Sequence, residues 1–197
     1  MTPPHDPSRR AVMTALGGLP LISFAAKTSI GGEMRQVGSR TLVAYFSRSG
    51  NTRVVAGLIH RALGADLFEI RPASPYPEDY LATVEQARQE RDRGFEPILE
   101  AEVPNMAAYD TVYLGFPIWG ETAPPVIRRF LKAHDLSGKT VIPFVTHGGY
   151  GLGDSESILA NHAPQARLHN GFSMQANQER QTMNRVRSWL SKIKTDG

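Results

Sequence analysis

The chain has 197 residues, of which 41% are hydrophobic and 21% charged, and this length fits one domain around a single buried core. It contains no cysteine, which excludes disulfides, thiolate metal sites and iron–sulfur clusters, and no apolar run reaches the roughly 20 residues of a membrane-spanning helix. Residues 1–40 carry five basic and two acidic groups, whereas residues 41–197, the body of the chain, carry 17 of each. The body therefore has no net charge and lacks the positive excess that nucleic-acid binding needs.

Residues 1–40 are predicted to be a signal peptide and a linker. The pair Arg9-Arg10 precedes a mildly apolar stretch at 11–26, and Ser23-Phe24-Ala25 offers a small-x-small cleavage site, so we expect cleavage after Ala25. The paired arginines resemble a twin-arginine signal, although the residues after them depart from the usual Phe-Leu-Lys. This resemblance implies export to the periplasm. The alternative is an N-terminal tail on a cytoplasmic protein.

Apolar runs alternate with segments of helical period from residue 41 onward. The first half is expected to hold a strand at 41–46, a helix at 52–63, a strand at 66–71, a helix at 78–93 and a long connection at 94–110. The first helix has one apolar stripe and ends at Gly64, a residue that favours helix termination. We expect the second helix to bury Leu81, Val84 and Ala87.

The second half continues the alternation. It is expected to hold a strand at 111–116, a helix at 124–134, a strand at 139–145, a helix at 155–162, a strand at 167–172 and a last helix that ends at Lys194. The last helix is expected to turn Met183, Val186, Trp189, Leu190 and Ile193 inward. Such alternation predicts an α/β protein with a parallel sheet and helices on both faces. Its ligand is then expected at the carboxyl ends of the strands.

The loop after the first strand has the composition of a phosphate site. Ser47, Arg48, Ser49, Gly50, Asn51 and Thr52 lead directly into a helix. Free N–H groups and the helix dipole favour an anion at such a terminus, and hydroxyls add hydrogen-bond donors. The loop lacks the motifs of nucleoside triphosphatases and dinucleotide binders, so a terminal monophosphate fits it best. The alternative is that Ser49 or Asn51 only caps the helix.

Three loops together resemble those of flavodoxins. The first matches their phosphate loop, Gly115-Phe116-Pro117-Ile118-Trp119-Gly120 is similar to a G-x-P-x-W segment of one flavodoxin-like branch, and the run 146–154 resembles their Gly-rich loop. The likeness covers about residues 41–194. It implies a three-layer, doubly wound fold whose five-stranded parallel sheet has the order 2-1-3-4-5, with a flavodoxin-like domain at 41–197.

The resemblance also implies FMN as the cofactor and assigns roles by position. The phosphate is expected at Ser47, Ser49, Gly50, Asn51 and Thr52, and Arg48 reaches the phosphate, contacts a partner or lies in solvent. The ring system is expected along Pro117, Ile118, Trp119 and Gly120, with Trp119 against one face. Its pyrimidine end is expected near Thr146, His147, Gly148, Gly149, Tyr150 and Gly151.

Leu152 stands where many flavodoxins have a tryptophan that stacks on the outer face of the ring. Either Tyr150 covers that face or it is open to a second ring, and an open face favours a reductase over an electron carrier. We therefore expect electron transfer or FMN-dependent reduction, with an NAD(P)H-dependent quinone or aromatic reductase and a flavin-less binding module as alternatives. The partner is a redox protein or a quinone-like molecule. The histidines outside the loops are dispersed, so no metal site is predicted.

Overall fold

A computed structural model describes residues 39–175 and 179–195, with the backbone alone for 179–184 and 194–195. The chain divides into two units, residues 1–36 and 37–197. The predicted signal peptide, with its arginine pair and its cleavage site, lies outside the described residues. Within the described ranges, no helix combines the length and the apolar character that a membrane crossing requires.

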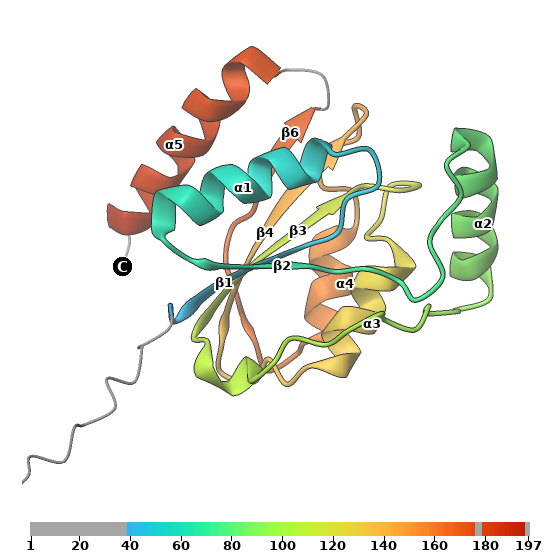
Figure 1. The fold of residues 1–197 in the computed structure, drawn as a ribbon, viewed down its shortest axis with the longest axis horizontal. Helices are drawn as coiled ribbons and strands as arrows, with labels where there is room; N and C mark the ends of the chain where they lie inside the picture. The colour runs from blue at the N-terminus through green and yellow to red at the C-terminus, as the bar shows by residue number, and fades with distance from the viewer. Residues whose placement is uncertain (1–38, 176–178, 196–197) are drawn as a thin grey trace, which may run out of the picture. The chain divides into compact units, whose positions relative to one another are not determined.

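The sheet is parallel, and its strand order confirms the predicted fold class. The order is β2-β1-β3-β4-β5, and a further strand, β6, also pairs with β4 (Figure 1). The strands are β1 (Thr41–Tyr45), β2 (Asp66–Glu69), β3 (Thr111–Pro117), β4 (Thr140–His147), β5 (Arg167–Leu168) and β6 (Phe172–Gln175). β1 and β3 lie between neighbours and are apolar nearly throughout, as strands covered on both faces must be.

The predicted fifth strand is interrupted, so β5 and β6 share one edge of the sheet. The interruption lies beside Pro143 of β4, which has no N–H to donate to a neighbouring strand. Gly171 packs directly against this proline, since a Cβ at position 171 would lie 2.8 Å from its Cγ. One proline therefore divides the strand that the sequence predicts as continuous.

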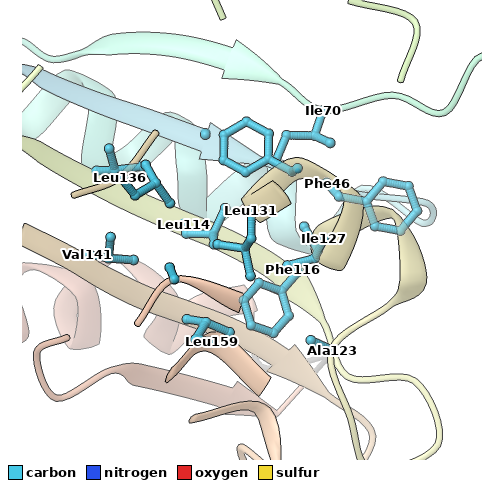
Figure 2. Packing of buried hydrophobic residues seen from close by; sticks show 14 of the residues in the cluster. Phe46, Ile70, Leu114, Phe116, Ala123, Ile127, Leu131, Leu136, Val141 and Leu159 are labelled. Carbon is cyan, nitrogen blue, oxygen red and sulfur yellow. The ribbon is translucent and has the colours of Figure 1, made fainter. Parts of the chain in front are cut away.

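Two helices cover each face of the sheet (Figure 1). α1 (Asn51–Leu63) and α5 (Glu179–Thr195) pack on one face, whereas α3 (Pro125–Ala133) and α4 (Ser155–His162) pack on the other. Figure 2 shows Leu114 of β3, Ile127 and Leu131 of α3 and Leu159 of α4 pointing toward one another. This packing fixes the carboxyl ends of β1, β3 and β4 side by side.

The last helix largely agrees with its prediction. Val186 and Leu190 are buried, and Trp189 and Ile193 are half-buried against the same core. The side chain of Met183 lies outside the described residues. Trp189 is a core residue, because its ring packs edge-on to Tyr113 and stacks on Phe172.

The inner face predicted for α2 (Tyr80–Asp92) is confirmed at Ala87 but wrong at Leu81 and Val84. Leu81 is 72% exposed and Val84 46%, whereas the residues turned inward are Thr83, Ala87 and Glu90. The start of the helix sets this phase, because Asp79 accepts a hydrogen bond from the Ala82 N–H and the Thr83 hydroxyl donates to carbonyls of the preceding turn. α2 stands away from the sheet (Figure 1), and a polar face holds it there.

The long connection that follows α2 is confirmed and contains little regular structure. Leu99 makes an isolated antiparallel bridge to Pro72, and a single 3₁₀ turn, η1, spans Met106–Ala108. Leu99, Val103 and Met106 are buried in the same core as α3. The connection therefore helps to cover the face of the sheet on which α3 packs.

Candidate cofactor site

A cavity of about 420 Å³ opens at the carboxyl ends of β1, β3 and β4, and its size is typical of small-molecule sites. Its walls are the loop after β1, the loop after β3, the loop after β4 and one side of α2. The structure brings most of the predicted site residues together here: Arg48, Ser49, Asn51, Thr52, Pro117, Ile118, Trp119, Gly120, Thr146, His147, Gly148 and Tyr150. The predicted residues Ser47, Gly50, Gly149 and Gly151 belong to the same loops but do not line the cavity.

The loop after β1 presents an uncapped helix terminus to this cavity. Gly50 is the N-cap residue of α1, in the left-handed region with φ 93°, and no side chain in the described structure caps the helix there. The alternative role of Ser49 or Asn51 as the cap is therefore not what the structure contains. Ser47 closes the loop, since its Oγ accepts a hydrogen bond of 3.1 Å from the Gly50 N–H. The first amides of α1 remain available to an anion.

Two buried threonines connect the first loop to the end of β4. The hydroxyls of Thr52 and Thr146 are 2.8 Å apart and hydrogen-bonded, and the two residues are 1% and 4% exposed. A hydroxyl that donates one hydrogen bond retains acceptor capacity, and one that accepts retains its own proton. The pair therefore fixes the distance between the two loops and still presents a polar group to the cavity.

The loop after β3 is a tight hairpin. Trp119 and Thr122 form an antiparallel bridge, and the two residues between them, Gly120 and Glu121, have φ of 58° and 65°. Positive φ at both positions is the pattern of a type I′ turn. Glu121 adopts a conformation that non-glycine residues rarely take, and its carbonyl is held by the Asp154 N–H at 2.9 Å.

Trp119 is half-buried within a group of three aromatic rings. Its ring meets Phe46 edge-on at 5.3 Å and Tyr76 edge-on at 4.9 Å between centroids. The Tyr76 hydroxyl donates a 2.7 Å hydrogen bond to buried Glu90 of α2. Burial, and then this carboxylate, raise the pKa of Tyr76 far above its usual value, so it stays a donor. The aromatic group thus connects the second loop to α2.

His147 is the last residue of β4, and one hydrogen bond within the loop that follows fixes which of its ring nitrogens is free to donate. Its Nδ1 accepts a 3.1 Å hydrogen bond from the Gly149 N–H, so in the neutral ring the proton lies on Nε2. Burial, and secondarily the charge of Arg185, lower the pKa of His147. The neutral ring is therefore favoured at pH 7, with Nε2–H as the remaining donor.

Leu152, in the loop after β4, does not cover the outer side of the cavity. This side chain is half-buried and packs against the core of the α3 face, and it does not line the cavity. Tyr150 does line it and is 68% exposed. Gly153 packs against the hairpin, since a Cβ there would lie 1.9 Å from the Glu121 carbonyl oxygen. The second and third loops are consequently joined.

The α2 wall is the part of the site that sequence reasoning missed. It is formed by Tyr80, Thr83, Val84, Ala87, Arg88 and Arg91. A signal for it was present, because an apolar stripe of only two large side chains beside several charges is weak support for a core helix. Of the side chains assigned to the core, Val84 borders the cavity and Leu81 lies at the surface.

Charge is distributed unevenly around the cavity. Arg48, Arg88 and Arg91 line it, and no acidic side chain of the described residues does. Arg48 is directed toward the start of α2, where it donates to the Glu78 carbonyl at 3.0 Å and lies over the Tyr80 ring. The cavity therefore suits an anionic ligand. In the part of the chain that the structure describes, no three histidine or acidic side chains come together as metal ligands.

Comparison with known proteins agrees with this geometry. A family model described as flavodoxin matches residues 40–193. The chain belongs to the flavodoxin family. No protein with a curated description matches it.

Solved structures extend the comparison. A candidate flavoprotein from Bacteroides eggerthii is 34% identical, with 78% of this chain and 96% of the other covered and a TM-score of 0.68. A second, from Bacteroides uniformis, is 33% identical, with 78% and 99% covered and a TM-score of 0.70. A flavoprotein from Lactobacillus acidophilus, solved in complex with FMN, is 20% identical, with 68% and 91% covered and a TM-score of 0.62; this likeness shows the shared fold.

Proposed function

We propose that this flavodoxin family member binds FMN and uses it for electron transfer or for the reduction of a second molecule. One observation carries the proposal: the uncapped N-terminus of α1 opens into the same cavity as Trp119, Tyr150 and the end of β4. A phosphate site and a flat, partly aromatic pocket are the two requirements of this nucleotide. The FMN complex of the Lactobacillus acidophilus relative supports the choice.

The residues present fit the group. The amides that begin α1, with the side chains of Ser49, Asn51 and Thr52, would hold the phosphate. Trp119 would lie along the ring, and the backbone near Gly148 would approach its polar edge without a Cβ in the way. The bound cofactor supplies one- and two-electron chemistry, and the protein contributes its binding and orientation.

Two ligands that differ by the phosphate alone test the proposal. FMN is expected to bind more tightly than riboflavin by a factor of at least roughly 10 to 100, because a single charge-assisted hydrogen bond to the phosphate contributes about 1.5–3 kcal/mol. Quenching of flavin fluorescence measures both affinities, and bound FMN gives an absorbance band near ~450 nm. A protein that binds neither flavin would instead be the flavin-less module, and equal affinity for the two would overturn the phosphate site.

A reductase is the second candidate, and the position of Leu152 favours it. Because this side chain packs into the core, the outer side of the cavity is left to the exposed Tyr150. A second ring then has access to the cofactor. Rapid bleaching of the flavin by NADPH, followed by turnover of a quinone, supports the reductase, whereas slow bleaching and fast exchange with a redox protein support a carrier.

Export remains part of the proposal. We infer that Arg9 and Arg10 direct the folded, cofactor-loaded protein to the periplasm through the twin-arginine route, with a cytoplasmic protein as the alternative. Replacement of both arginines by lysine is expected to retain the protein in the cytoplasm. Cell fractionation with an antibody against the body measures this, and an unchanged distribution would contradict it.

A further inference from the structure

We infer that the α2 wall contains a subsite for a planar aromatic anion, whose acid group pairs with Arg91. The inference rests on the proposed function, because the anion would lie beside the bound cofactor. Its starting point is the charge of the cavity, which three arginines line and no acidic side chain of the described residues does. The body of the chain as a whole carries equal numbers of basic and acidic residues, so this concentration is local.

Arg91 reaches from α2 to the hairpin after β3. A Cβ at Gly120 would lie 2.5 Å from Nη1 of Arg91, so the glycine makes room for the guanidinium. The Arg91 side chain is 35% exposed, and its one ion pair in the described structure is with neighbouring Asp92 at 3.2 Å. Asp92 is shared with Arg88, which also pairs with Glu85. Arg91 is therefore the less neutralised of the two arginines.

The phosphate of the cofactor does not account for this cation. The start of α2 lies near the phosphate loop, since Arg48 contacts both Glu78 and Tyr80. Arg91 is eleven residues beyond Tyr80, about 16 Å along the helix. Exposed charges separated by more than about 8–10 Å are largely screened at physiological salt. Arg91 is therefore a separate cation at the end of the cavity away from the phosphate loop.

The surface between the two ends suits a flat apolar body. Tyr80, Val84 and Tyr150 line the cavity and are 65%, 46% and 68% exposed. Aromatic and branched side chains supply contact area at little cost in conformational entropy. The planar guanidinium fork binds carboxylate or sulfonate through two parallel hydrogen bonds. The ligand class that satisfies both features is an aromatic ring with a carboxylate, sulfonate or phosphate substituent.

Binding to the FMN-loaded protein tests the inference with two probes, naphthoquinone sulfonate and uncharged naphthoquinone. Protein and probe are both oxidised, so the change in the flavin absorbance measures binding alone. The sulfonate is expected to bind roughly tenfold more tightly than the uncharged probe, in keeping with one charge-assisted contact. Arg91→Gln is expected to abolish this preference and to leave the affinity for the uncharged probe unchanged.

Arg93→Gln is the matched control, because Arg93 is the exposed residue that ends the same helix and does not line the cavity. It is expected to keep the preference although it removes the same charge. Equal affinity for both probes, or equal effects of the two variants, would overturn the inference alone. A loss of FMN affinity in Arg91→Gln with the preference intact would also overturn it. Failure of the unmodified protein to bind FMN overturns the proposed function and this subsite with it.

Discussion

The two helices beside the cavity are attached to the molecule in opposite ways. α1 buries Val55, Ala56 and Ile59 against the sheet, and its N-terminus is consequently fixed relative to β1. α2 turns Thr83 and Glu90 inward, and side-chain hydrogen bonds hold it. Apolar packing thus places the end that is proposed to bind phosphate, whereas a polar contact places the wall opposite. The comparison predicts a rigid phosphate site beside a wall that opens more easily.

The largest difference is expected between Ile59→Ala and Leu81→Ala. Ile59 is fully buried, so its truncation is expected to lower the free energy of unfolding by about 2–5 kcal/mol. Leu81 is 72% exposed, and its truncation is expected to change it by less than about 0.5 kcal/mol. Urea denaturation of both variants measures this. A cost at Leu81 similar to that at Ile59 would show that α2 packs as a core helix.

Gly153→Ala tests the joint between the second and third loops. Position 153 has φ of 55°, and a Cβ there would lie 1.9 Å from the Glu121 carbonyl oxygen, so the hairpin must move. We expect a loss of about 1–3 kcal/mol of unfolding free energy and weaker FMN binding. Gly148→Ala is the control for stability alone, since nothing lies within 4 Å of a Cβ at that position. Similar losses of unfolding free energy in both variants would argue against the joint.

Tyr76→Phe tests the attachment of α2. The substitution removes the hydroxyl that donates to Oε2 of buried Glu90, whose Oε1 still accepts from Gln86, and a buried polar atom left without its partner costs about 1–3 kcal/mol. We expect faster hydrogen exchange in α2 with little change in α1. Tyr109→Phe is the control, because its hydroxyl also donates to a carboxylate, that of Asp66, on another part of the molecule. Equal exchange in α2 for the two variants would contradict this prediction.

The sequence was sufficient for the parts of the fold that apolar periodicity determines. The strands and helices lie close to their predicted ranges, and α4 spans Ser155–His162 as predicted. The burial of Glu90 in α2 was not predicted, because it depends on a partner, Tyr76, that precedes the helix. The interrupted fifth strand had a signal in Pro143, which lies within the strand predicted at 139–145.

The candidate site was predictable to the same extent. The loops after β1, β3 and β4 converge because parallel strands bring their carboxyl ends to one edge, and loop composition identified them. The α2 wall and Arg91 were missed, because the weak apolar stripe of α2 argues against a core helix but does not indicate that the helix stands over a cavity. The position of Arg91 depends on Gly120, which is distant in the chain. A contact between residues so far apart in the chain forms only in the folded protein, so no local sequence pattern predicts it.

The smallest expected effect concerns His147, which belongs to the fixed side of the cavity. Burial and Arg185 lower its pKa in the folded protein, whereas an unfolded histidine has a pKa of about 6.5. Between these two values the unfolded chain binds more protons than the folded one, so folding stability falls as the pH decreases through this window. His147→Gln is expected to lose less stability than the wild type when the pH is lowered from about 7 to 5.

Urea denaturation at several pH values measures this slope, and His169→Gln is the control because His169 is exposed and does not line the cavity. The control is expected to keep the wild-type slope. An unchanged slope in His147→Gln would mean that the ring takes up its proton in the fold as readily as in the unfolded chain. The third loop would then be as accessible to solvent as α2, and the contrast between a packed side and an opening wall would not hold at this end of the cavity.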